Sequence, residues 1–220
     1  MNILLGYVLT FGWIGVVFAV SLLVKNKLHT SDEVSRKIVH ICVSFSWVFM
    51  YLCFGITWHL LVPPAIFIVV NYISYKSDLL PMMERDEKDA SSLGTVYYAV
   101  SLFIMATLSL IDKRFILPYG VGIFCMAFAD GLAPYFGSIK KGNFEIIRGK
   151  RSFYGCLSVF CVSFLVTAAM ILIFSVPIGW GEAALVACGA MIFEMIGLKG
   201  FDNITLPIGT ALLTWLFIVF

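Results

Sequence analysis

Residues 115–142 read FILPYGVGIFCMAFADGLAPYFGSIKKG. The run from 115 to 136 carries a single charged side chain, Asp130. It is long enough to cross a bilayer as a helix, which takes about 20 residues. Glycine, serine and two lysines follow directly. The stretch therefore predicts a membrane-spanning helix that carries a carboxylate one to two turns before one of its ends.

The composition of the whole chain also indicates a membrane protein. Of its 220 residues, 61% are hydrophobic and 13% are charged, whereas soluble domains are about 45–50% apolar and about 25% charged. The apolar runs lack the alternating polarity of a membrane β-barrel. We therefore predict an all-α, polytopic membrane protein, a single domain over residues 1–220 with about eight transmembrane helices. The expected helices cover residues 3–24, 37–54, 58–75, 94–111, 115–136, 153–174, 181–198 and 204–220.

The basic residues predict how these helices are oriented. Thirteen of the 15 Lys and Arg residues lie in alternate gaps between the helices, and the other gaps hold only Lys113 and Arg114. By the positive-inside rule, the thirteen face the cytoplasm and both chain termini face the outside. The net charge of +2 is too small to indicate nucleic-acid binding.

Acidic residues gather at the predicted cytoplasmic helix ends. Asp130 lies near the end of the fifth helix, Glu194 lies about one turn before the end of the seventh, and Asp202 follows shortly after. A carboxylate at mid-helix in a membrane costs roughly 2.5 to 3.5 kcal/mol on insertion scales, so each of them needs a partner. Because Mg²⁺ binds carboxylate and phosphate oxygens, we predict that these three acids hold a divalent cation.

The segment after the Asp130 helix, residues 137–152, is predicted to be a cytoplasmic loop that binds phosphates. It contains several glycines and five basic residues. Glycine lets the backbone approach a phosphate closely, and basic side chains neutralise its charge. The candidate nucleotide-binding residues are Lys140, Lys141, Gly142, Lys150, Arg151 and Ser152, with Asn203 as a hydrogen-bonding neighbour. Further candidates at the same predicted face are Arg36, Lys37, His40, Thr95, Tyr98, Gly137 and Gly155.

Each of these features also has a purely structural interpretation. Asp130 can pair with a lysine that only stabilises the fold. Ala129, Ala133 and Gly137 recur every four residues, a spacing that lets two helices approach. Basic loop residues also determine topology and contact lipid headgroups. His40 can simply hydrogen-bond to a neighbouring helix. The sequence alone leaves both interpretations open.

Four motifs resemble the CTP-dependent lipid kinases, a family that includes dolichol kinase, phytol kinase and the CTP-using diacylglycerol kinase. They are RKIVH (Arg36–His40), GTVYY (Gly94–Tyr98), ADGLAPYFG continuing through KKG to GKRSFYG (Ala129–Gly155), and Glu194 followed by FDNITLP (Phe201–Pro207). The motifs occur in the order seen in the family, and the resemblance covers about residues 36–208. It implies transfer of the terminal phosphoryl group of CTP to the hydroxyl of a polyprenol, a phytol-like isoprenoid alcohol or a diacylglycerol. The choice of CTP over ATP is implied by the resemblance alone.

This resemblance suggests roles for the candidate residues. Asp130 is expected to bind the metal or to orient the substrate hydroxyl, and Asp202 is expected to act beside it. With the predicted orientation, this active site faces the cytoplasm. The family usually has a glutamate before the last glycine of GKRSFYG, whereas this chain has Tyr154, so no role is assigned to that position.

Two other functions are compatible with parts of the pattern. A phosphatidate cytidylyltransferase shares the acidic helix end and the lysine-serine loop. The serine-proline-lysine-lysine run expected there is missing from this chain, and 220 residues is short for that family. A small transporter would line a path with intramembrane acids, whereas the acids here gather at one predicted face. Neither the acceptor lipid nor the oligomeric state is apparent from the sequence.

Overall fold

The computed structural model describes residues 2–77, 93–137, 143–146, 149–197 and 200–220, and the side chains of all of these except 32–33, 143–146 and 149–151. The chain divides into two compact units, Met1–Lys113 and Arg114–Phe220, each described by itself below. The earlier interpretation of the chain as a single domain stays a prediction.

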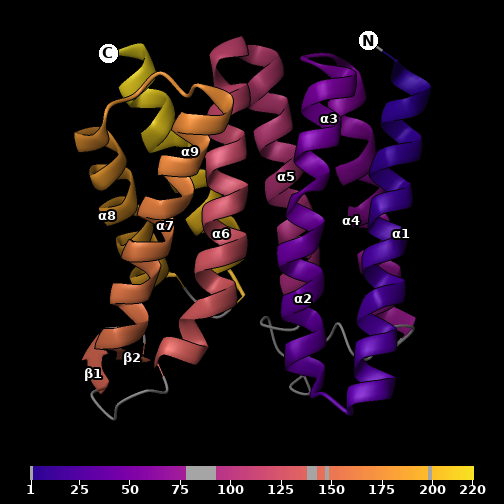
Figure 1. Cartoon of the computed structure of the whole chain (residues 1–220), viewed down its shortest axis with the longest axis horizontal. Coiled ribbons are helices and arrows are strands. Elements are labelled where there is room, and N and C mark those ends of the chain that lie inside the picture. Colours follow the sequence, from indigo (N-terminus) through magenta and orange to yellow (C-terminus); the bar gives the residue numbers. More distant parts are fainter. Residues whose placement is uncertain (1, 78–92, 138–142, 147–148, 198–199) are drawn as a thin grey trace. The chain divides into compact units, whose positions relative to one another are not determined.

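The described part of unit 1 consists of α-helices and one short 3-10 helix. The elements are α1 (Ile3–Leu28), α2 (Asp32–Ser44), α3 (Ser46–Phe54), the 3-10 turn η1 (Trp58–Leu61), α4 (Val62–Ser77) and α5 (Gly94–Ile111) (Figure 1). Helix α1 packs along α2 and α3, and α4 packs against α5. Trp47, Met50 and Phe54 of α3 are fully buried, whereas Leu4 and Val8 of α1 are exposed. Such exposed apolar faces suit helices that contact lipid.

The second predicted span is interrupted at Phe45, between α2 and α3. In a continuous helix the Phe45 N–H would bond to the Ile41 carbonyl, but here it donates to the Cys42 carbonyl at 3.2 Å. The Ser44 hydroxyl donates instead to Ile41 O at 2.6 Å. From α1, the Trp13 indole N–H donates to Cys42 O at 2.7 Å. Carbonyl groups within a membrane need such partners, so side chains stabilise the interruption.

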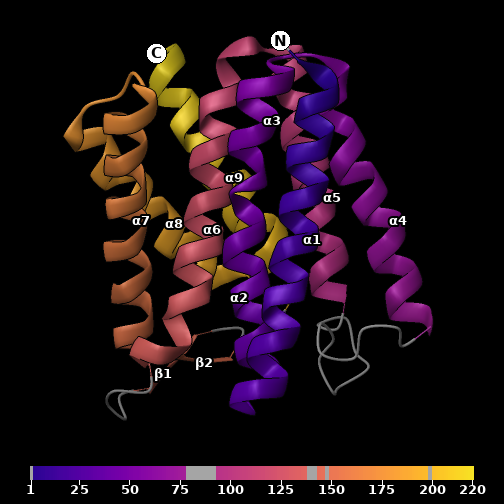
Figure 2. The same cartoon turned by 45° about the vertical axis from the view of Figure 1, so that its right-hand side comes forward.

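Unit 2 is a four-helix bundle with a β-hairpin at one end. After the 3-10 turn η4 (Lys113–Phe115) come α6 (Ile116–Gly137), β1 (Asn143–Ile146), β2 (Gly149–Ser152), α7 (Phe153–Phe174), α8 (Trp180–Ile196) and α9 (Asp202–Val219) (Figure 2). Helix α6 packs against α7 and α9, and α8 packs against the same two helices, so the four form a closed ring. Thirteen of the 22 residues of α6 are buried. Asp130 is therefore carried by a helix that is enclosed for most of its length.

Helices α6 and α9 approach each other at Gly122. A methyl group added at Gly122 would lie 2.9 Å from the Cβ of Ala211 and closer still to the carbonyl oxygen of Pro207. No larger residue fits there unless the two helices separate. Small residues at helix contacts let backbones come close together in membrane proteins, and this contact fixes the spacing of the two helices that carry Asp130 and Asp202.

The predicted loop over 137–152 contains regular structure. Strands β1 and β2 pair antiparallel, with Asn143 opposite Ser152 and Ile146 opposite Gly149. The sequence analysis did not anticipate this hairpin. It connects the end of α6 to the start of α7.

The predicted all-α, polytopic membrane fold is confirmed. Among the described residues, seven helical segments are long and apolar enough to cross a membrane: Ile3–Leu28, Val34–Phe54, Trp58–Ser77, Gly94–Ile111, Lys113–Gly137, Phe153–Phe174 and Asp202–Val219. The remaining predicted span corresponds to α8, a helix of 17 residues. The orientation of the termini stays a prediction.

Candidate metal centre

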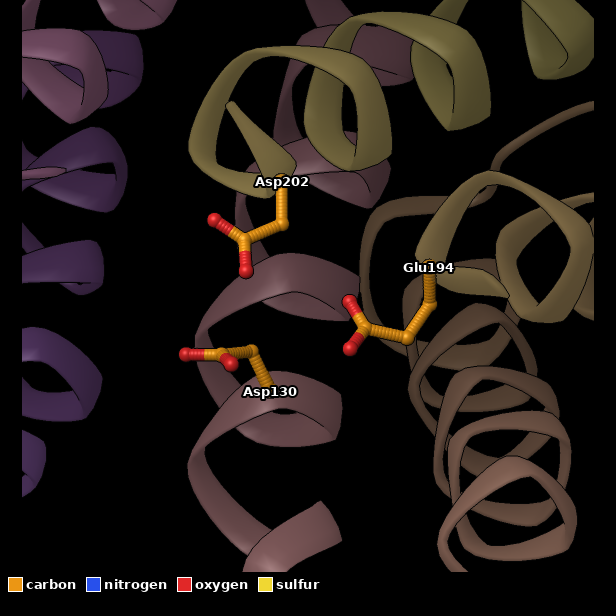
Figure 3. A group of neighbouring side chains, drawn as sticks. All are labelled: Asp130, Glu194 and Asp202. Atoms are coloured by element: carbon orange, nitrogen blue, oxygen red, sulfur yellow. The ribbon is translucent and has the colours of Figure 1, made fainter. Parts of the chain in front are cut away.

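Three carboxylates from three helices of unit 2 come together in the structure. Asp130 lies on α6, Glu194 on α8 and Asp202 at the first position of α9. One oxygen of each lies within 4.8 Å of one oxygen of each of the others. Figure 3 shows the three side chains close to one another, each on a different helix. The structure thus groups the three acids for which the sequence predicted a shared metal.

The turn between α8 and α9 places two of these acids side by side. Glu194 lies in the last turn of α8 and is only 8% exposed. Gly200, with a φ of 88°, adopts a backbone conformation that favours glycine. Asp202 then opens α9, where the helix dipole favours a negative charge. The backbone N–H of Asn203 donates to Asp202 Oδ1 at 3.0 Å and orients that carboxylate.

The donor set fits a hard divalent cation. Three carboxylates this close repel one another when ionised, and a bound cation removes that repulsion. All three offer oxygen, the ligand that both Mg²⁺ and Ca²⁺ prefer. Two oxygens bound to one Mg²⁺ at about 2.1 Å lie at most about 4.2 Å apart. Because the three oxygens lie within 4.8 Å of one another, small side-chain rotations bring them into that range.

Three of the predicted residues join α6 to the hairpin and to α7. The Ser152 hydroxyl donates to the carbonyl oxygen of Gly137 at 3.1 Å. A methyl group added at Gly137 would lie 3.8 Å from the Cα of Gly155, which shows that the two glycines face each other in ordinary contact. Ser152 therefore ties the last residue of the hairpin to the end of the Asp130 helix.

The side chains of the basic candidates for phosphate binding lie outside the described part of the structure. Lys140, Lys141 and Gly142 lie outside the described residues. For Lys150 and Arg151 the backbone belongs to β2, and their side chains lie outside the description. Their contact with phosphates stays a prediction.

The remaining candidates belong to unit 1. The rings of His40 on α2 and Tyr98 on α5 lie 4.5 Å apart between centroids. The carbonyl oxygen of Thr95 accepts a hydrogen bond from Asn71 Nδ2 of α4 at 3.0 Å. The sequence analysis did not single out Asn71, although an amide within an apolar run is a signal of a contact between helices. Arg36 and Lys37 lie on α2, where Lys37 is buried.

Comparison with known proteins finds two similar proteins, both described as phytol kinases. A phytol kinase of Synechocystis sp. is 29% identical over 204 residues, which cover 86% of this chain and 82% of that protein. The chain is therefore similar to this phytol kinase over most of the length of both proteins. A probable chloroplastic phytol kinase of Triticum aestivum is 28% identical over 232 residues, covering 94% of this chain and 74% of that protein. These phytol kinase homologues confirm the resemblance to lipid kinases that the motifs indicated.

No family model matches the chain, and no solved structure matches it.

Proposed function

We propose that this protein is a membrane-bound kinase that transfers a phosphoryl group to the hydroxyl of a lipid alcohol. The observation that carries the proposal is the cluster of Asp130, Glu194 and Asp202 in a chain similar to phytol kinases. Phosphoryl transfer asks a protein mainly for positioning and for charge stabilisation around the phosphates. In this proposal, the carboxylate cluster holds a divalent cation that stabilises charge, and the basic residues between α6 and α7 position the phosphates.

The three acids have distinct parts in this proposal. All three would hold Mg²⁺, which when bound neutralises charge on the phosphates of the nucleotide. Asp130 is also the candidate for orienting the acceptor hydroxyl and accepting its proton. The hydroxyl oxygen then forms a bond to the terminal phosphorus as the bond to the nucleoside diphosphate breaks. Asp202, held by the Asn203 N–H, keeps its carboxylate in a fixed orientation during this exchange.

The two substrates reach the site from different phases. The lipid alcohol comes from the bilayer, with its hydroxyl at the interface. The nucleotide, proposed to be CTP from the family resemblance, comes from the cytoplasm, and its phosphates contact Lys150, Arg151 and Ser152 of β2 and the basic residues before the hairpin. The positive-inside pattern of the basic residues supports a cytoplasmic active site.

Labelled nucleotides test the proposal directly. The full chain, purified in detergent, is incubated with Mg²⁺ and with phytol, a polyprenol, diacylglycerol or, as the acceptor of a cytidylyltransferase, phosphatidate, each in parallel reactions with CTP and ATP. Label at the terminal phosphate must appear in the lipid product, and label at the α-phosphate must not. Transfer of the α-label would identify a cytidylyltransferase and overturn the proposal. Transfer to no alcohol with either nucleotide would also overturn it.

A further inference from the structure

We propose that Gly197 sets the spacing of the carboxylate cluster and thereby makes the centre selective for Mg²⁺ over larger divalent cations. The inference rests on one part of the proposed function, the binding of a divalent cation by the three acids. It concerns a residue outside the cluster, which acts through the position of Asp202.

Gly197 is the first residue after α8, directly before the chain turns toward α9. Its N–H donates to the carbonyl oxygen of Phe193 at 3.0 Å and so closes the last turn of the helix that carries Glu194. Five residues further on, Asp202 begins α9. The spacing of the Glu194 and Asp202 carboxylates therefore depends on how closely the end of α8 contacts the start of α9.

The backbone conformation of Gly197 does not explain why this residue is glycine. Its φ is −59°, a value that any residue adopts. Gly200 in the same turn differs, because its φ of 88° favours glycine. A requirement for glycine at position 197 must come from its surroundings.

The surroundings of Gly197 consist of the acid itself and the end of α8. A methyl group added at Gly197 would lie 3.3 Å from both the Cα and the Cβ of Asp202, and 3.2 Å from Phe193 O. Contacts of this length are tighter than carbon atoms normally make, so a neighbour must shift by a few tenths of an ångström. The Phe193 oxygen is held by the last turn of α8. The displacement therefore falls on Asp202 and moves its carboxylate away from α8 and from Glu194.

A shift of this size discriminates between cations. Mg²⁺ requires ligands at about 2.0 to 2.1 Å in near-ideal octahedral geometry, whereas Ca²⁺ accepts about 2.3 to 2.6 Å in flexible geometries. Two ligands on one ion are thus at most about 4.2 Å apart for Mg²⁺ and about 5.2 Å apart for Ca²⁺. The three oxygens are at most 4.8 Å apart, so small side-chain rotations bring them within the Mg²⁺ limit, whereas a wider cluster meets only the Ca²⁺ limit. A wider cluster weakens Mg²⁺ binding and leaves Ca²⁺ binding nearly unchanged.

Titration calorimetry of the metal-free full chain with MgCl₂ and with CaCl₂ tests the inference without any substrate. We expect Gly197→Ala to weaken Mg²⁺ binding about tenfold or more and Ca²⁺ binding less than about threefold. The matched control is Gly181→Ala at the start of α8, where an added methyl group meets no atom within 4 Å. It must leave both affinities unchanged. Asp202→Asn must weaken the binding of both ions.

The outcomes separate this inference from the proposed function. Equal loss of Mg²⁺ and Ca²⁺ affinity in Gly197→Ala, or no loss of either, overturns the role of Gly197 and leaves the metal centre standing. Failure of the wild-type protein to bind either ion overturns the metal centre itself. The wild-type protein also tests the inference when the variant does not fold, because it must bind Mg²⁺ more tightly than Ca²⁺. The reverse order overturns the selectivity.

Discussion

The two units of the chain hold their helices together by different means. In unit 1, side chains bridge the helices: Trp13 donates to Cys42 O, and the Tyr7 hydroxyl lies 2.7 Å from His59 Nδ1. At Gly6 of α1, the atoms nearest to an added methyl group belong to the side chains of Cys53 and Phe54. In unit 2, backbone atoms come this close, Pro207 O at Gly122 and the Cα of Asp202 at Gly197. A metal centre needs ligands held to within about 0.5 Å. Direct backbone contact provides this better than long side chains do, and the three acids lie in the unit that is packed in this way.

The sharpest test of this comparison removes a carboxylate from unit 2. We expect Asp130→Asn to lower the turnover of the lipid kinase reaction roughly a thousandfold or more, because the change removes a charge that acts on the reacting groups. The measurement is phosphorylated lipid formed per unit time, with circular dichroism to show that the helices are intact. Glu182→Gln is the matched control, because Glu182 lies in the first turn of α8, at the opposite end of that helix from Glu194. Turnover retained in Asp130→Asn would remove this residue from the mechanism.

A second test introduces the same methyl group into each unit. Gly122→Ala forces α6 away from Pro207 and Ala211, and overpacking of this kind costs roughly 1 to 3 kcal/mol. In α1 of unit 1, the space around Gly12 is open, so Gly12→Ala should stabilise the protein by about 0.5 to 1 kcal/mol through helix propensity. Thermal unfolding in detergent measures both effects. If both variants raised the melting temperature, or both lowered it, the effect of the methyl group would not depend on the close contact at Gly122.

A third test weakens a side-chain bridge in unit 1. Trp13→Phe removes the indole N–H that donates to Cys42 O at the interruption between α2 and α3. Loss of one such hydrogen bond costs about 0.5 to 1.5 kcal/mol. The melting temperature in detergent should fall, and Mg²⁺ binding by the cluster in unit 2 should stay unchanged. Trp180→Phe, at a side chain that is 55% exposed, is the control. Loss of metal binding in Trp13→Phe would contradict the assignment of the centre to unit 2 alone.

The helices could be predicted from the sequence because hydropathy decides which segments enter a membrane. All eight predicted segments are helical. The interruption at Phe45 could not be predicted, since the residues around it include neither proline nor glycine. The stabilising hydrogen bond comes from Trp13, 29 residues away. The hairpin was also missed, because eight strand residues are too few to show a pattern that distinguishes them from a loop.

The acids of the site were apparent from the sequence for a similar reason. Placing a carboxylate inside a membrane costs free energy, so an acid within an apolar run, such as Asp130 or Glu194, is a signal of function. The two acids were predicted at the same depth in the membrane, which suggested that they bind the same ligand. Gly122 and Gly197 could not be identified in this way. Their importance lies in distances to Pro207 and Asp202, and a glycine in an open environment, such as Gly181, looks the same in the sequence. Close contacts between helices are a property of the folded chain.

The smallest expected effect lies at the junction of the hairpin and α6. Ser152→Ala removes the hydroxyl that donates to Gly137 O at 3.1 Å. Because this bond ties β2 to the Asp130 helix, its loss should raise the KM for the nucleotide about threefold. This change is about 0.65 kcal/mol, near the lower end of the roughly 0.5 to 1.5 kcal/mol of one hydrogen bond. Ser158→Ala is the control, since its hydroxyl donates to Gly155 O within the same helix, and it should leave the kinetics unchanged. A fall in kcat with an unchanged KM would instead mean that Ser152 takes part in the chemistry and does not merely position the hairpin.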